Sequence, residues 1–388
     1  MSRPPLNRRL AGLGTTIFSE MSELAVATGS INLGQGFPDT DGPAEIAQAA
    51  ADAIMTGRGN QYPPGAGIPE LRRAIAAHQR RFYDLALDPD SEVLVTAGAT
   101  EAIAASLLAL VEPGDEVIAF EPYYDSYAAC VTMAGGVRVP VTLREPDFRP
   151  DIDALAASIT DRTRLILLNS PHNPTGSVFT RDELTAIAEL ARRHDLLVVS
   201  DEVYEHLVFD GEHVPVASLP GMRERTVTIS SAAKTFSFTG WKIGWVTGTP
   251  ELVAAVRTVK QFLTYVSGGP FQYAIARALA LPDDFYTSVA SDLRARRDLM
   301  CDGLVSAGFA VFRPAGTYFV TTSVRTFGEA GGLEFCRKLP YQAGVVAIPM
   351  QVFYDHPDAG QFQVRFAFCK QPQILSDAIE RLRDLRPA

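Results

Sequence analysis

The chain contains little cysteine, and its four cysteines are scattered without CxxC spacing: Cys130, Cys301, Cys336 and Cys369. This pattern argues against a disulfide framework and against a metal cluster, and it suits a reducing cytoplasm. The sequence also lacks an apolar run of the roughly 18 residues that a membrane helix needs. The charges near the N-terminus are not followed by an apolar stretch, so we expect no signal peptide. These absences predict a cytoplasmic protein without a bound metal and without a membrane partner.

Positive charge is scarce as well. Lysine and arginine number 35 against 45 aspartates and glutamates, which leaves a formal net charge of -10. This balance argues against nucleic acid or an anionic membrane surface as the main partner, although a local cationic pocket for a phosphate remains open. With 388 residues and an ordinary apolar content, the chain is long enough for two globular domains.

The hydrophobic pattern changes along the chain. From about Glu92, strands alternate with helices, which indicates βαβ units and a mainly parallel sheet. The last hundred residues have a different pattern, which predicts a smaller α+β layer. We expect an N-terminal arm with part of a small domain over 1–42, a large domain over 43–283 and a small C-terminal domain over 284–388. The strands predicted for the large domain are 92–97, 116–120, 138–143, 165–168, 196–200, 226–230 and 243–247.

One stretch, from Thr228 to Trp245, holds a lysine at the point where a buried strand should end in a turn. Hydroxyl side chains surround this residue, Lys234, and a second cation, Lys242, follows eight residues on. Most lysines lie on the surface, so a solvated loop residue is one interpretation. The apolar flanks favour a buried amine, which is the group that forms Schiff bases with carbonyl compounds.

The spacing around this lysine resembles the lysine motif of class I aminotransferases. A serine stands three residues before Lys234, a hydroxyl three after, a glycine six after and a cation eight after. The resemblance covers nearly the whole chain and is strongest to the kynurenine/glutamine aminotransferase-like subgroup, including actinobacterial N-succinyldiaminopimelate aminotransferases. It implies an α/β protein of fold type I, with a large, mainly parallel seven-stranded sheet domain that binds pyridoxal 5'-phosphate and a smaller α+β domain. It also implies a homodimer with shared active sites.

The resemblance assigns residues to the cofactor phosphate. The first predicted strand leads through a glycine turn into a helix N-terminus, where free N–H groups make an anion site. Such turns are common in α/β proteins, so this signal is weak without the lysine motif. The turn and its helix would bind the phosphate together with two residues of the lysine stretch and a tyrosine from the other subunit: Gly98, Ala99, Thr100, Ser231, Lys242 and Tyr62. The family usually has an arginine at the position of Lys242. A lysine supplies a point charge but lacks the planar fork with which arginine binds a phosphate in a bidentate manner.

Other residues are expected at the cofactor ring. Tyr124, or else Tyr123, would stack on it, and Lys234 would hold it as a Schiff base. Asn173, in an Asn-Pro-Thr-Gly turn, and Tyr204 would bond its phenolic oxygen. Asp201 ends an apolar strand and would keep the pyridine nitrogen protonated, although a helix N-cap is the plainer interpretation.

Arg365 is the expected partner of the substrate. It alternates with apolar neighbours, and a buried arginine without a partner is too costly to persist. A structural salt bridge is one solution; the resemblance implies another, the α-carboxylate of an amino acid, bound bidentate. Further substrate contacts are expected from Gly36, Phe37, Asn173 and Tyr318. These aromatic surroundings favour a long or apolar side chain, and the distal carboxylates of a succinylated substrate would need a further cation, such as Lys260 or an arginine of the partner subunit.

The sequence thus predicts an aminotransferase in which the freed Lys234 moves the Cα proton. A cysteine-conjugate β-lyase would need the same residues. A regulator on this fold would need an added DNA-binding domain, for which the acidic chain has no room. A nicotinamide-dependent dehydrogenase would need a G-x-G-x-x-G turn, which the residues from Gly98 on do not supply.

Overall fold

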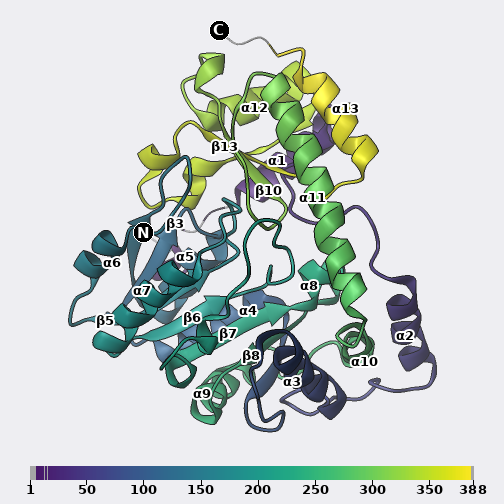
Figure 1. Ribbon diagram of the computed structural model, residues 1–388, viewed down its shortest axis with the longest axis vertical. Helices are drawn as coiled ribbons and strands as arrows, with labels where there is room; N and C mark the ends of the chain where they lie inside the picture. Colours follow the sequence, from purple (N-terminus) through teal and green to yellow (C-terminus); the bar gives the residue numbers. More distant parts are fainter. Residues whose placement is uncertain (1–5, 13, 15, 386–388) are drawn as a thin grey trace.

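A seven-stranded sheet forms the larger part of the molecule in the computed structural model, which describes residues 6–12, 14 and 16–385 (Figure 1). Its spatial order is β2-β8-β7-β6-β5-β3-β4. The paired strands from β3 to β7 run parallel, and β8 is antiparallel to β7 and β2. All seven predicted strands are confirmed, and they are β2 (Val93–Ala97), β3 (Glu116–Glu121), β4 (Val137–Thr142), β5 (Thr163–Asn169), β6 (Leu197–Asp201), β7 (Thr226–Ser231) and β8 (Ile243–Thr247).

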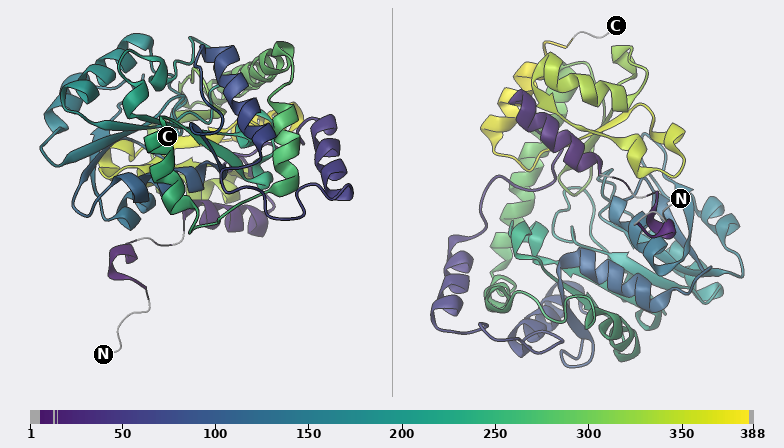
Figure 2. Two further views of the ribbon diagram at one scale, coloured as in Figure 1. Left: turned by 90° about the horizontal axis from the view of Figure 1, so that it is seen from below. Right: turned by 180° about the vertical axis from the view of Figure 1, so that it is seen from behind.

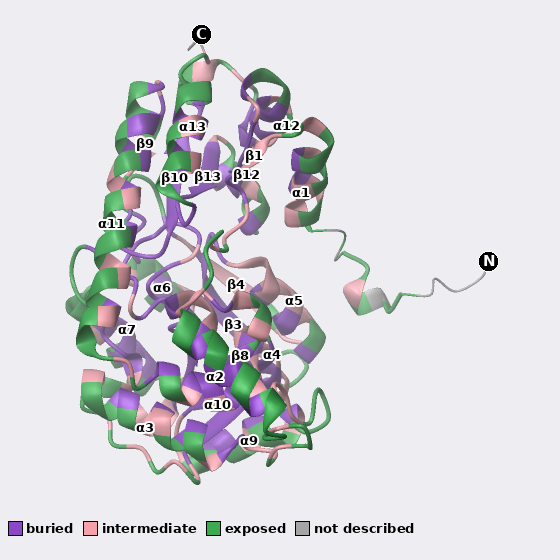
Figure 3. Cartoon of the chain, turned by 90° about the vertical axis from the view of Figure 1, so that its right-hand side faces the viewer, coloured by how far each residue is buried: buried purple, intermediate pink, exposed green. Residues whose placement is uncertain are grey.

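Helices cover both faces of this sheet, because strand side chains alternate between two apolar cores. Leu94 packs on one face with α4 (Gly98–Leu110), α5 (Asp125–Ala134) and α9 (Pro250–Lys260). Val93 and Val95 point to the other face. Helices on that face are α2 (Ala44–Met55), α3 (Pro69–Tyr83), α10 (Gly269–Ala278), α6 (Ile152–Ser158) and α7 (Arg181–Arg193). Figure 3 shows the buried strands enclosed by helices that expose their outer sides.

A second, antiparallel sheet lies beyond the first, in the order β12 (Ile348–Pro349), β13 (Gln363–Ala367), β10 (Phe319–Ser323) and β9 (Ala310–Phe312). The N-terminal segment belongs to this part, since Met21, Ala25 and Leu33 share its core. The long helix α11 (Asp283–Ser306) runs beside both parts (Figure 2). The remaining elements here are α1 (Ile17–Thr28), β1 (Ile31–Asn32), which pairs with β11 (Val345–Val346), α12 (Gly332–Ala343) and α13 (Pro372–Leu382).

The topology gathers polar strand ends at one place. Asn169, Asp201 and Ser231 end three neighbouring parallel strands, β5, β6 and β7. Ligands of open α/β sheets bind outside the carboxyl ends of such strands. Among the described helices, none combines the length and apolar character needed to cross a membrane.

Candidate active site

A cavity of about 250 Å³ opens at these strand ends and reaches β10 and β13 of the second sheet. Its lining residues extend in the sequence from Phe18 to Arg365, because both parts of the molecule contribute to its wall. Of the predicted site residues, those that line it are Gly36, Phe37, Gly98, Ala99, Thr100, Tyr124, Asn173, Asp201, Tyr204, Ser231, Lys234, Lys242 and Arg365. Tyr62 and Tyr318 do not line it.

Lys234 lies in α8 (Ala232–Thr235), a single helical turn directly after β7. Its Nζ donates a 2.9 Å hydrogen bond to the Tyr318 hydroxyl, which donates to the Gly36 carbonyl oxygen at 2.6 Å. Burial lowers the pKa of the Lys234 amine to about 8. Lys234 is partly buried at the cavity wall, and its amine gives up its proton more readily than the amine of a surface lysine, as a nucleophilic lysine requires.

Asp201 ends β6 and is 4% exposed. The Tyr127 hydroxyl donates to its Oδ2 at 2.6 Å, and the Val203 backbone N–H donates to its Oδ1 at 3.3 Å. Burial raises the pKa of this carboxyl to about 6, and the hydrogen bond from Tyr127 opposes that rise. A carboxylate in this setting would be stabilised by a cation placed in the cavity.

Arg365 lies on β13, is 1% exposed, and lines the cavity from the second sheet. Its Nη1 donates to Asn173 Oδ1 at 3.1 Å and its Nη2 to the Gly34 carbonyl oxygen at 2.9 Å. Its Nε has no hydrogen-bond partner in the part of the chain that the structure describes. The guanidinium lies 4.0 Å from the ring centre of Phe319, and burial lowers its pKa to about 10.

The sequence left two candidate partners for Arg365, a structural salt bridge and a substrate carboxylate. Over residues 6–12, 14 and 16–385, the side-chain partners of its guanidinium are an amide and aromatic rings, and no acidic residue forms a salt bridge with it. A buried charge is costly unless it is paired. The arrangement therefore favours an anionic ligand over a structural salt bridge.

Another part of the cavity wall, formed by the Gly98 turn and Lys242, is suited to a second anion. Helix α4 begins at Gly98, so its first N–H groups have no partner within the helix. Gly98 has φ +74°, and a Cβ there would lie 3.3 Å from Lys242 Nζ. A Cβ at Gly244 would lie 2.6 Å from the Gly98 carbonyl carbon, so the strand must pass close to this turn. A lysine amine beside a helix N-terminus is suited to a phosphate.

The tyrosines of the Glu121–Tyr127 segment are separated by the structure. Tyr124 lines the cavity, and Tyr123 is buried, with its hydroxyl donating to Asp355 Oδ2 at 2.6 Å. Tyr124 is therefore the ring that is available to a ligand. Tyr127, which sequence reasoning left without a role, supports Asp201 instead.

Asn169 is a second residue that sequence reasoning missed. Its Nδ2 donates to the Asp201 carbonyl oxygen at 2.7 Å, and its Oδ1 accepts from the Asn173 backbone N–H at 2.7 Å. It thereby fixes the turn that carries Asn173 against the end of β6. An asparagine that ends a buried strand was the available signal.

Four predicted residues have surroundings that the sequence did not reveal. Tyr318 contacts the Lys234 amine from behind and is not part of this cavity wall. A Cβ at Gly36 would lie 2.4 Å from Phe319 Cζ, so packing against that ring already requires glycine. Lys260 Nζ donates to the Tyr265 and Gly65 carbonyl oxygens and does not reach the cavity. Tyr62 is 81% exposed, at the surface beside Tyr265.

The fold and the residues of this cavity are those of a known protein family. Residues 28–382 match the family described as aminotransferase class I and II, and the chain belongs to that family. It is an aminotransferase of fold type I, as the lysine motif predicted.

Several members of this family are similar to the chain over nearly its whole length. The chain is 54% identical to the probable N-succinyldiaminopimelate aminotransferase DapC of Mycobacterium tuberculosis, over 98% of this chain and 99% of that protein. The solved structure of the Mycobacterium tuberculosis N-succinyldiaminopimelate aminotransferase superposes with a TM-score of 0.96 and covers 98% of this chain and 100% of that one. The methionine aminotransferase of Escherichia coli is 40% identical over 99% of this chain and all of that protein. Mouse kynurenine–oxoglutarate transaminase 3 is 38% identical over 97% of this chain and 89% of that protein. These relatives confirm the resemblance seen in the sequence and favour transamination over the β-lyase alternative.

The buried carboxyl of Asp201 should make ligand-free stability depend on pH. Its pKa is about 6 in the folded protein and about 3.9 in an unfolded chain. The folded state holds this proton more tightly, so the stabilising contribution is fully present below about pH 4 and is lost as the pH rises through about 6. We expect ligand-free Asp201→Asn to exceed ligand-free wild type by about 1–3 kcal/mol at pH 8, with a smaller difference at pH 5. Chemical denaturation at both pH values measures this, and a less stable variant at pH 8 would count against a buried, ionised Asp201.

Proposed function

We propose that this aminotransferase binds pyridoxal 5'-phosphate at Lys234 and moves an amino group between an amino acid and a 2-oxo acid. The observation that carries the proposal is Arg365, a buried guanidinium whose Nε has no partner among the described residues and which lines the same cavity as Lys234 and Asp201. An α-carboxylate would complete its hydrogen bonds. The residues on the walls fit the cofactor as well, since the cavity has separate places for an anion, an aldehyde and a ring cation.

The cofactor-binding residues are proposed by group. The phosphate would be held by Gly98, Ala99, Thr100, Ser231 and Lys242, with Tyr62 of the partner subunit. Tyr124 would stack on the ring, Asn173 and Tyr204 would bond its phenolic oxygen, and Asp201 would balance its nitrogen. When bound, pyridoxal phosphate supplies an aldehyde that condenses with amines and a ring that takes up the electron pair released at the substrate Cα.

The chain's own residues handle the substrate and the proton. Arg365 orients the amino acid by its carboxylate, with Gly36 and Phe37 beside it in the cavity wall. Lys234 Nζ would take the proton from the substrate Cα and deliver it to C4′ of the cofactor, acting as base and then as acid. The Tyr318 hydroxyl, 2.9 Å from Nζ, positions the amine for both steps. The low pKa of Lys234 suits a group that must lose and regain a proton near neutral pH.

Replacing Arg365 with lysine is expected to weaken the recognition of amino acids. A lysine keeps the positive charge but lacks the planar fork that holds a carboxylate bidentate, and charged hydrogen bonds contribute about 1.5–3 kcal/mol. We therefore expect kcat/KM for an amino acid to fall by about 10- to 100-fold. Steady-state kinetics with an amino acid, and single-turnover rates with the matching amine that lacks the carboxylate, test this. An equal loss with both substrates would contradict the assigned role.

The proposed substrate is the one named for a similar protein. We propose that N-succinyldiaminopimelate, the substrate named for the 54% identical Mycobacterium tuberculosis protein, is the natural amino donor. The cationic side chains on the described cavity wall are Lys234, Lys242 and Arg365, which all have proposed partners already. The distal carboxylates must therefore bind near the cavity mouth, where a partner subunit could reach. The aromatic wall, with Phe18, Phe37 and Phe319, supports neutral or aromatic amino acids as the second candidate.

A panel of donors and acceptors separates these candidates. The donors are N-succinyldiaminopimelate, methionine, kynurenine and glutamate, each with pyruvate, 2-oxoglutarate and glyoxylate. The proposal predicts the highest kcat/KM for N-succinyldiaminopimelate. A preference for methionine or kynurenine supports the second candidate, and pyruvate with ammonia from cysteine conjugates as the main products would support the lyase.

We also propose a cytoplasmic homodimer. Large apolar side chains are exposed on two segments that lie side by side, at Tyr62 and at Phe262, Leu263 and Tyr265, with 82% exposure for Phe262. Gly59 and Gly269 bring these segments into contact. Such a patch is typical of a subunit interface. Analytical ultracentrifugation tests the proposal, and a monomer at micromolar concentration would contradict it. The four buried, free cysteines suit a reducing compartment.

A further inference from the structure

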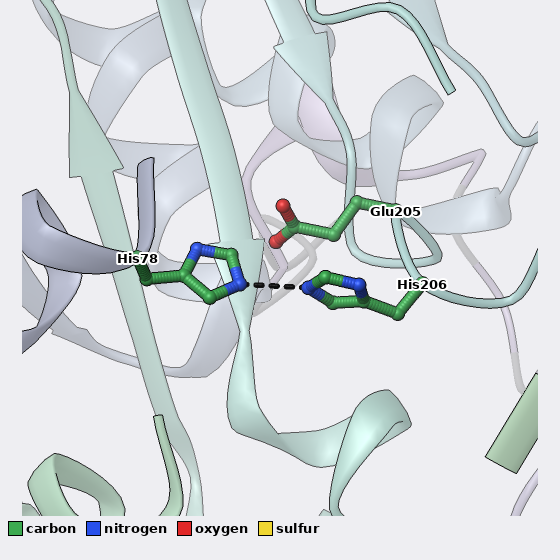
Figure 4. Close-up of side chains that lie close together, drawn as sticks. All are labelled: His78, Glu205 and His206. Atoms are coloured by element: carbon green, nitrogen blue, oxygen red, sulfur yellow. Dashed lines mark hydrogen bonds between the residues drawn. The ribbon is translucent and has the colours of Figure 1, made fainter. Parts of the chain in front are cut away.

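A cluster of metal-ligand side chains lies outside the active-site cavity, between α3 and the segment that follows β6 (Figure 4). His78 is 2% exposed, Glu205 is 5% exposed, and His206 is partly exposed. The Nε2 atoms of His78 and His206 face each other at 2.7 Å. One ligand atom from each of the three residues lies within 4.8 Å of the other two. This cluster could not be recognised in the sequence, because His78 is more than a hundred positions from the other two residues.

We propose that His78, His206 and Glu205 bind a divalent transition-metal ion, for which Zn²⁺ is the best match. Two imidazoles and one carboxylate, with a fourth position for water, form a common zinc ligand set. Zn–N distances of about 2.0–2.1 Å place two nitrogens about 3.3 Å apart in a tetrahedral site. The rings of His78 and His206 would therefore separate by about 0.6 Å from their present 2.7 Å.

Neighbouring side chains already hold the ligands in place. The Gln79 amide lies 3.5 Å from His78 Nδ1, the ring nitrogen that faces away from the proposed ion. The Ser230 hydroxyl donates to Glu205 Oε1. Metal-bound histidines and carboxylates usually have such outer partners, which fix their orientation.

The position of the cluster gives the ion a structural role. Glu205 and His206 directly follow Tyr204, in the segment that begins at Asp201, and Ser230 precedes Ser231. An ion here would join α3 to both segments, which line the active-site cavity. Because it binds the folded chain only, it would stabilise the fold and hold these segments in position without taking part in amino transfer.

Cobalt substitution and thermal unfolding test the site. The full-length holoenzyme is purified without a metal-affinity tag, and unbound cofactor is removed by dialysis. We expect Co²⁺ to bind at one equivalent per chain with the visible bands of a tetrahedral site. We also expect Zn²⁺ to raise Tm by several degrees, an effect that EDTA reverses.

The variant His206→Gln should lose both signals, because it removes one ligand at a partly exposed position. The matched control is His194→Gln, at the exposed end of α7, which should keep both. Wild-type protein without cobalt bands and without a zinc-dependent Tm would overturn the proposal, whether or not the variant folds. Cobalt bands of equal strength in His206→Gln would overturn it too, since they would place the ion elsewhere.

Discussion

Lys234→Ala is expected to lose turnover and the visible absorbance of bound cofactor together. The substitution removes the amine that lines the cavity and donates to Tyr318. Loss of a positioned acid–base group alone costs about 10²–10⁴-fold in rate, and loss of the covalent anchor adds to this. We therefore expect kcat to fall by about 10⁴-fold or more. Absorbance spectra and single-turnover kinetics with the best donor measure both effects.

A matched control separates this effect from a general loss of lysine. Lys338 lies on α12, where its side chain is 44% exposed and pairs with Glu329 and Glu334, and it is not among the residues that line the cavity. Lys338→Ala should keep the wild-type spectrum and rate. If Lys234→Ala kept both as well, the assignment of the nucleophile would be wrong.

Asp201→Asn is expected to slow the reaction strongly without releasing the cofactor from Lys234. The neutral amide keeps the shape of the carboxyl group but cannot hold a positive charge on the ring nitrogen. Removal of one preorganised electrostatic partner costs about 10²–10³-fold in kcat, and we expect a loss of that size. The visible absorbance should remain, because the lysine is intact.

Two comparisons sharpen this experiment. A cofactor analogue methylated at the ring nitrogen carries a permanent positive charge, so it should restore part of the activity of Asp201→Asn. Asp195→Asn, at a carboxyl group that is 95% exposed, serves as the control and should behave as wild type. Full activity of Asp201→Asn with the natural cofactor would show that Asp201 does not balance the ring.

Much of the fold and site was predictable because the signals are local. Apolar strands ending in polar residues located Asp201, and the hydroxyl-rich turn located Lys234. A polar residue also ends the strand at Asn169, but this pattern does not reveal its partner. The partners of Tyr127 and Asn169 were not predictable, because both bond to Asp201, which is 74 and 32 positions away along the chain.

The turn before β10 explains one difference from the expected site. Strand β10 begins at Phe319, since Thr317 has φ 65° and cannot continue a strand. Tyr318 was expected in the cavity wall, but its hydroxyl bonds both Lys234 and the Gly36 carbonyl oxygen, which draws the ring behind the lysine. The direction of the Tyr318 side chain depends on the turn at Thr317 that precedes β10. The alternation of apolar residues in the sequence does not reveal that turn.

The central claim is that one amine holds the cofactor. Borohydride reduction of the holoenzyme makes that linkage permanent, and peptide mass spectrometry then locates the added pyridoxyl phosphate group. The account predicts a single modified peptide that carries the group on Lys234. Modification of Lys242, Lys260 or another lysine, with Lys234 unmodified, would contradict it.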